Sequence, residues 1–460
     1  MGLFTKKDVT QILDEAEHTK LNKVLTPKDL AALGIASVVG TGIFVISGVA
    51  ASQYAGPAVI ISFIITALAA FFAGLSYAEL ASMFPLAGST YTYTYAAFGE
   101  LIAWIIGWDL MLEYLVSAAA VASGWSAYFV SLLKNAGISL PHALTTTPIN
   151  GGIIDLPAVI ITFLVSWLLY LGIKETATSN NIVVVLKLLL LIVFIVVGAQ
   201  HINPANWHPF APFGWKGIMG GAAIIFFTFV GFDAVSTAAE ETRNPGRDVP
   251  LGLIYTLIVV TILYIGVALV LTGMVSYKEL NLADPLAYAL NKYHLTWVAN
   301  FISIGALIGM VATLLVTLYG QTRVFLAMAR DGLLPKVFGK IHEKHKTPHV
   351  ITWATAVVTA IFAGLLPIDI LAELTNIGTL FAFVLVSFGV WYLRAKRPDI
   401  ERKFKTPLMP LVPILAAGFS IYLMASLPVQ TWWRFGAWLL VGLVIYFAYS
   451  RFHSKVKEVK

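Results

Sequence analysis

The sequence predicts an all-α integral membrane protein with twelve transmembrane helices, and composition and segment length support this prediction. Of the 460 residues, 58% are hydrophobic and only 12% are charged, whereas soluble domains carry about 25% charged residues. The apolar runs are about 20 residues long, which is the length of a membrane-spanning helix. Strands of an outer-membrane barrel would instead alternate apolar and polar residues. The chain is therefore expected to cross a lipid bilayer many times.

Polar loops separate the apolar segments, and each segment is expected to form one helix. Pro27 suits the first turn of the first helix, because proline fixes a helical φ and needs no donor there. The expected helices cover residues 28–50, 57–83, 98–132, 156–173, 180–200, 217–241, 251–275, 296–327, 350–366, 371–394, 407–427 and 431–450.

The first 26 residues are polar and precede the first expected helix. Within them, Val9, Ile12, Leu13 and Ala16 would share one face of a short amphipathic helix, which would lie on the membrane surface. The first apolar run begins near Leu30 and is long enough to span a membrane, so no cleavable signal peptide is expected.

The distribution of basic residues predicts the orientation in the membrane. Of the 30 Lys and Arg residues, 24 fall in segments on the side of the N-terminus, 5 fall on the opposite side, and Lys187 falls within a helix. Basic loops stay in the cytoplasm, so both termini are expected there. The net charge of +6 follows from this bias, and no nucleic-acid partner is expected.

The twelve helices divide into two sets of five and a final pair. The first set covers residues 27–200 and the second covers 201–394, while helices 11 and 12 occupy 395–450 before a cytoplasmic tail at 451–460. Five crossings are an odd number, so the second set must be inverted relative to the first. The sequence thus predicts a five-plus-five inverted repeat.

The first helix of each set contains an interruption. Val38-Val39-Gly40-Thr41-Gly42 places two glycines inside an apolar segment, and residues 226–233 of the sixth segment carry Thr228, Gly231 and Asp233. Glycine costs about 1 kcal/mol in a helix interior, and a break in lipid leaves backbone groups unpaired. Matched interruptions point to a transporter's binding site near the membrane midplane. The alternative is that the glycines only allow close helix packing.

The two interruptions suggest which ligand would bind. The helix that resumes after Gly40 presents free N–H groups, which suit a carboxylate. The unwound carbonyls near Val38 and from Phe227 to Val230 suit an ammonium group. A site with both is shaped for a zwitterion such as an α-amino acid.

Four ionisable residues fall within the expected helices, namely Asp109, Glu113, Lys187 and Asp233. Such residues are costly in a membrane and are functional candidates by default. Glu113 is expected near the membrane midplane, where it would have a functional role. The alternative is a structural role, as a buried carboxyl that forms a hydrogen bond with a neighbouring hydroxyl. Asp109 lies four residues before Glu113, on the same face of the helix. For Asp109 we favour a structural pairing with a neighbouring group. Lys187 would either exchange a proton during transport or extend to the membrane surface.

Several classes of function are not supported by the sequence. All nine histidines lie in loops or tails and there is no cysteine, so haem ligation within the bundle, thiolate metal sites and disulfides are not expected. The chain has no GxxxxGK[ST], HExxH or GxSxG motif. We therefore expect neither an enzyme nor a bound metal or cofactor.

Several motifs resemble those of the amino acid–polyamine–organocation (APC) transporter superfamily. The motifs of the superfamily are Gly-Thr-Gly-Ile-Phe at 40–44 and the segments at 226–236 and 240–245. Residues 319–323 and 329–335 resemble more narrowly the cationic amino acid transporter branch and its bacterial relatives. The resemblance runs from about residue 24 to 450. It implies a leucine-transporter-type fold and proton-coupled amino acid import across a bacterial cytoplasmic membrane.

The resemblance also implies individual roles. Thr41 and Gly42 would donate to the substrate carboxylate, and Val38, Phe227 and Val230 would accept from its amine, with Phe227 also acting as a gate. Lys187 would replace the sodium ion of sodium-coupled relatives, so no sodium is expected. Glu113, Asp233 and Thr317 would line the site from helices 3, 6 and 8.

Three functional classes remain open at this stage. A proton-coupled amino acid symporter is the preferred interpretation, an amino acid or polyamine exchanger is the alternative, and a channel or receptor-like protein is the third. Small neutral substrates such as alanine are favoured over arginine or lysine, since Glu113 alone clearly offers a negative charge. The sequence does not decide whether a small membrane protein, sterol or lipid packs beside helices 11 and 12.

Overall fold

The computed structural model describes residues 3–7, 23–84, 89–172, 177–282, 284–345 and 347–455, without the side chains of 177–180 and Glu240. Within these residues the regular structure is helical, apart from two isolated β-bridges. The expected all-α class is therefore confirmed. The amphipathic segment expected at residues 9–16 lies outside the described residues.

Most helices lie close to the ranges expected from the sequence. They are α2 (Pro27–Val38), α3 (Ser47–Ala50), α4 (Val59–Met83), α5 (Ser89–Phe98), α6 (Glu100–Asn135), α7 (Leu156–Tyr170), α8 (Ala177–Ala199), α9 (Gly214–Ile225), α10 (Ala234–Thr237), α11 (Pro245–Met274), α12 (Pro285–Lys292), α13 (Thr296–Arg330), α14 (His349–Leu365), α15 (Ile368–Lys396), α16 (Leu411–Ala425), α17 (Val429–Ile445) and α18 (Arg451–His453). In the described residues, 8 helical stretches are long and apolar enough to cross a membrane. The shorter apolar helices α7, α14 and α16 add to them.

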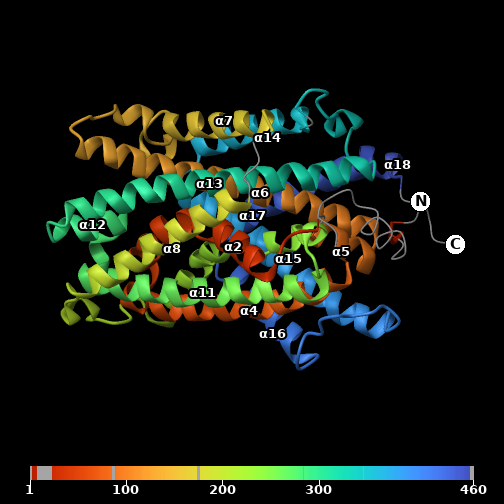
Figure 1. Cartoon of the computed structure of the whole chain (residues 1–460), viewed down its shortest axis with the longest axis horizontal. Helices are drawn as coiled ribbons and strands as arrows, with labels where there is room; N and C mark the ends of the chain where they lie inside the picture. Colours follow the sequence, from red (N-terminus) through yellow and green to blue (C-terminus); the bar gives the residue numbers. More distant parts are fainter. Residues whose placement is uncertain are drawn as a thin grey trace.

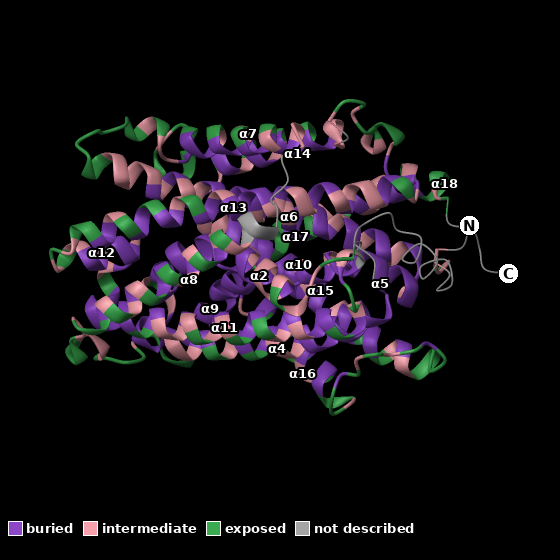
Figure 2. Ribbon diagram, in the orientation of Figure 1, coloured by how far each residue is buried: buried purple, intermediate pink, exposed green. Residues whose placement is uncertain are grey.

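The helices run along the long axis of one bundle (Figure 1). In this view α7 and α14 cover one side, α4 and α11 cover the other, and α2 lies between them. Buried residues fill the middle of the bundle, while exposed residues follow the outer helix faces (Figure 2). Many of the exposed side chains are large and apolar, such as Trp167 and Ile262, as expected where a bundle faces lipid.

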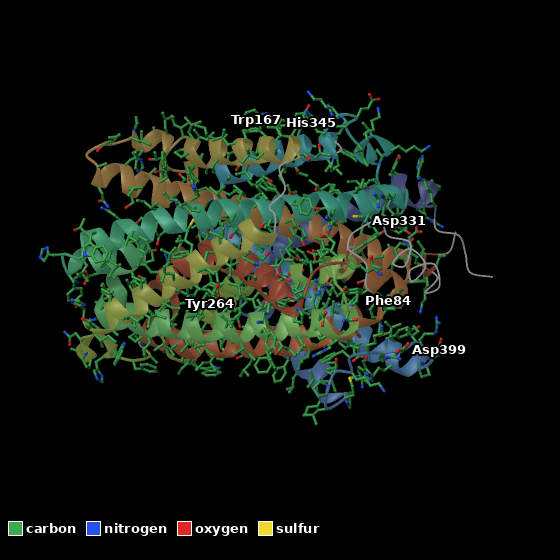
Figure 3. All side chains as sticks on the ribbon, viewed as in Figure 1. Phe84, Trp167, Tyr264, Asp331, His345 and Asp399 are labelled. Carbon is green, nitrogen blue, oxygen red and sulfur yellow. The ribbon has the colours of Figure 1, made fainter. Side chains whose placement is uncertain are left out.

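Both described ends of the chain lie at the same end of the bundle. The Lys7 ammonium lies 3.5 Å from the Asp331 carboxylate, and the Lys455 N–H donates to the Asp331 carbonyl at 2.9 Å. Figure 3 shows Asp331 at this end, together with Phe84, whereas Tyr264 lies between the two ends. The N-terminal and C-terminal segments therefore share one side of the bundle.

The helices α5, α12 and α18 were not expected from the sequence. Residues 90–95 alternate Thr and Tyr, a pattern that favours a strand, yet they lie in α5, which is buried against α6. Gly99 (φ +92°) separates these helices, so α6 begins at Glu100. The short α12 also lay outside the expected ranges. α11 begins at Pro245, six residues earlier than expected, because this proline occupies the first helical position.

Asp155 precedes α7 and shows how burial affects a loop carboxylate. Its Oδ1 accepts from Ser126 Oγ (2.5 Å) and the Ala158 N–H (3.3 Å), while burial raises the pKa of Asp155 to about 6. A carboxyl whose pKa rises on folding stabilises the folded state below pH ~4, and this stability is lost as the pH rises through about 6. Asp155→Asn keeps the acceptor and removes the charge. We expect it to stabilise the protein by about 1–3 kcal/mol at pH 7.5 and to have no effect at pH ~4.

Thermal unfolding in detergent at the two pH values would check this expectation. An equal or lower melting temperature of Asp155→Asn at pH 7.5 would contradict it.

Candidate functional site

The first interruption separates α2 from a π-helical turn. α2 ends at Val38, Val39 is extended (φ −77°, ψ 94°), and the helix resumes at Thr41 before the π segment Gly42–Ile46. The first N–H groups of a helix have no partner within it. Those of Thr41 and Gly42 are therefore available to an anion, and the positive end of the helix dipole adds to the attraction.

Buried side chains satisfy the carbonyls that α2 leaves free. The Lys187 ammonium donates to the Ala36 carbonyl at 2.6 Å and to Thr313 Oγ1 at 2.7 Å. The Tyr264 hydroxyl donates to the Val38 carbonyl at 3.1 Å. Lys187 is fully buried, so it does not extend to the membrane surface. The end of α2 carries negative partial charge, and the position of this ammonium complements it.

The second interruption follows α9. A 3-10 turn covers Phe226–Phe229, Val230 is extended (φ −59°, ψ 137°), and Gly231 has φ +105° before α10 begins. Thr66 donates to the Ala222 carbonyl, and the Asn376 amide donates to the carbonyls of Ala223 and Ile224, at 2.8–3.1 Å. Polar side chains from α4 and α15 thus stabilise a break that lipid alone would not tolerate.

The two interruptions touch each other. A Cβ on Gly42 would lie 2.7 Å from Thr228 Cα, and one on Gly124 of α6 would lie 2.2 Å from Thr41 Cγ2. Gly42 thus allows backbone contact between the broken helices. The sequence left two explanations of this glycine open, close helix packing and a place in the candidate site, and Gly42 is compatible with both.

A cavity of about 400 Å³ lies where the interruptions meet. Nine of the residues expected in the site line it, namely Val38, Gly40, Thr41, Gly42, Glu113, Phe227, Val230, Asp233 and Thr317. Val39 is fully buried and does not line the cavity. Lys187 lies behind α2, between that helix and α13, and does not line it either. The cavity therefore joins residues from four distant parts of the sequence.

Two carboxyl groups lie on one side of the cavity. Glu113 and Asp233 are each only 4% exposed and lie within electrostatic range of each other. Among the described residues, no Lys or Arg forms an ion pair with either carboxyl. This side of the cavity is suited to hold protons or to attract a cation.

The cavity extends from the interruptions to the end of the bundle where α2 begins. There it is lined by Val24, Leu25 and Asn181, among others. The Arg323 guanidinium lies 3.4 Å from the Glu241 carboxylate and over the ring of Tyr319. An ion pair therefore lies beside the opening.

Several residues that build this site were missed in the sequence. Thr313 and Gly309 precede Thr317 by four and eight residues, so a stripe of small and hydroxyl residues on α13 was a usable signal. Asn376 is a buried amide in an apolar helix, and it was also detectable as an intramembrane polar residue. Tyr264 gave no signal, because one tyrosine in an apolar helix is common.

The comparisons with known proteins agree with this geometry. The family model described as "Amino acid permease" matches residues 25–447. The chain belongs to the amino acid permease family, within the APC superfamily. It is accordingly a multi-pass membrane transporter and not an enzyme.

Characterised relatives differ in the substrates that their names give. The chain is 49% identical to the branched-chain amino acid permease BcaP of Bacillus subtilis, over 99% of each chain. It is 47% identical to the methylthioribose transporter of Bacillus subtilis, over 99% of this chain and 100% of the relative. It is also 38% identical to the vacuolar cationic amino acid transporter 4 of Arabidopsis thaliana, over 84% of this chain and 66% of the relative.

Proposed function

We propose that this amino acid permease imports neutral L-amino acids together with protons, by alternating access, across a bacterial cytoplasmic membrane. The meeting of the two interrupted helices in one cavity supports this proposal most directly. The free N–H groups of Thr41 and Gly42 suit the substrate carboxylate. The carbonyls at Phe227 and Val230 suit its ammonium group, and the Phe227 ring would close the site as a gate.

One detail of the proposed amine site differs from the sequence-based expectation. The Val38 carbonyl already accepts from Tyr264, and the Phe227 carbonyl accepts from the Val230 N–H at 3.3 Å. A carbonyl has two lone pairs, so both can still accept from a substrate. Val230, whose extended backbone leaves the helical ladder, is the least constrained acceptor.

The proposed topology has twelve membrane helices, with both termini in the cytoplasm. The two described ends share one side of the bundle, and most basic residues of the sequence fall in segments assigned to that side, as cytoplasmic loops require. In the proposed topology the cavity extends toward the cytoplasmic end of the bundle, and we infer an inward-facing state. The interruptions begin the two proposed five-helix repeats.

Lys187 is the proposed coupling residue, in place of a sodium ion. Its ammonium joins α2 to α13 through the Ala36 carbonyl and Thr313, which are oxygen ligands of the kind that a cation would use. Loss of its proton would weaken this link. Protonation and the position of α2 are thereby coupled, which is what a proton-driven conformational change needs.

The cavity favours a neutral side chain. Val121, Leu315 and Val316 line it beside the interruptions and would contact an aliphatic group. The name of the branched-chain permease supports this class. Cationic amino acids are the second candidate, because Glu113 and Asp233 also line the cavity and the plant relatives are named for cationic substrates. The methylthioribose relative shows that substrate identity varies among similar chains.

Reconstitution into liposomes would test the proposal. Uptake of radiolabelled leucine, alanine and arginine would be measured in sodium-free buffer, with and without an inward proton gradient. We expect gradient-stimulated accumulation of a neutral label into empty liposomes. Uptake only into liposomes preloaded with amino acid would instead establish an exchanger, and preferred uptake of arginine would establish a cationic substrate.

A further inference from the structure

Asp109 is a fully buried carboxyl, and the structural pairing expected for it from the sequence is not found among the described residues. It lies on α6, one turn from Glu113, and it is 0% exposed. Neither carboxyl oxygen has a hydrogen-bond partner among the described residues. On α15, a Cβ added to Gly378 would lie 2.7 Å from Asp109 Oδ1. The absence of a side chain at Gly378 thus leaves room for this carboxyl.

The charged surroundings of Asp109 are acidic. Glu113 lies within electrostatic range of both Asp109 and Asp233, and Asp233 lies on the cavity. α15 contributes the hydroxyl of Thr379 beside Glu113. No described Lys or Arg side chain from the helices packed on α6 forms an ion pair with Asp109.

An ionised carboxylate in this position would be very costly. Burying an isolated charge costs many kcal/mol, and a buried group neutralises instead. This position therefore favours the neutral acid over the carboxylate. If its role were only to fill space, an apolar residue of similar volume would serve equally well or better. A neutral acid one helical turn from Glu113 is instead placed to exchange a proton with it.

We propose that Asp109 is an additional proton-carrying residue of the transport cycle, which exchanges its proton with the cavity through Glu113. In this step the O–H bond of the Glu113 acid breaks, and an O–H bond forms on the Asp109 carboxylate. The pair keeps one negative charge throughout. The inference rests on the proposed proton coupling and extends it from Lys187 on α8 to the carboxyl groups of α6.

Asp109→Asn tests the proposal, because the amide has the shape of the protonated acid and cannot exchange the proton. Proteoliposomes containing a pH-sensitive dye would report proton influx with substrate, and counterflow would report exchange without net proton movement. We expect Asp109→Asn to retain counterflow but to lose substrate-driven proton influx and gradient-driven accumulation. Asp155→Asn, a buried carboxyl outside the cavity, is the control and should behave as wild type in both assays.

The outcomes separate this inference from the proposed function. If wild type shows no proton influx, the proposed function fails and the inference fails with it. If wild type shows influx and Asp109→Asn matches it, only the inference is overturned. Should Asp109→Asn lose counterflow as well, infrared spectra of the wild-type protein would decide. A buried carboxylic-acid band that titrates with pH and shifts in frequency in Asp109→Glu would support the inference, and a band unchanged in that variant would overturn it.

Discussion

Lys187→Met is expected to reduce proton-driven accumulation to the level of protein-free liposomes while the protein stays folded. Methionine keeps an unbranched side chain as far as Cε, and the Cε of Lys187 packs 3.0 Å from the position of a Cβ on Gly309. It removes the group that links the Ala36 carbonyl to Thr313 and that would gain and lose the proton. Uptake with an inward proton gradient measures the loss.

The stability of Lys187→Met should change little. Its loss of transport can then be attributed to lost proton coupling and not to unfolding. Thr313 Oγ1 also lies 3.2 Å from the Ala36 carbonyl, so that acceptor keeps a donor after the substitution. Replacing a buried charged group by an apolar one of similar size is often neutral or stabilising. We therefore expect an unchanged or higher melting temperature and measurable substrate binding. Lys134→Met, at the exposed end of α6, is the control for loss of a positive charge.

Two results would contradict this role of Lys187. Full gradient-driven accumulation by Lys187→Met would show that the residue only supports the end of α2. Loss of both substrate binding and accumulation would show that Lys187 acts by shaping the binding site. Retained counterflow without accumulation is the pattern that proton coupling requires.

The sequence predicted the elements of this fold that depend on local pattern. Apolar length located the membrane helices, and Pro27 marked the start of α2. Gly40 and Gly42 located the first interruption, because a helix in lipid rarely places two glycines so close together without a reason. The residues on either side of the interruptions were therefore predictable candidates for the site, and Thr41 and Phe227 line the cavity together.

The remaining site residues depend on contacts between distant helices. Tyr264 and Asn376 satisfy carbonyls in α2 and α9, yet each is more than 150 residues from at least one partner. No periodic pattern of residues in the local sequence indicates that two such distant residues are in contact. The same limit explains Val39, which shares the interruption but is turned away from the cavity. Its position depends on how the backbone bends, and the glycine pattern does not specify this.

Gly42→Ala is expected to weaken substrate binding and transport more than any other single-methyl addition at the interruptions. The new methyl group would lie 2.7 Å from the Cα of Thr228, and a backbone atom cannot move aside as a flexible side chain can. Overpacking of this kind costs about 1–3 kcal/mol. Since the methyl would separate the carboxylate donors from the amine acceptors, we expect that cost to raise the Kd by roughly 5- to 150-fold.

Gly418→Ala in α16 and Gly436→Ala in α17 are matched controls, because a Cβ at either position meets nothing within 4 Å. Both should bind substrate as wild type and gain up to about 1 kcal/mol from the better helix propensity of alanine. Binding measured by substrate-induced thermal stabilisation compares the three variants. If Gly42→Ala bound substrate as the controls do, backbone contact between the broken helices would not set the geometry of the site. Weaker binding in Gly42→Ala alone would show that one contact holds both halves of the site together.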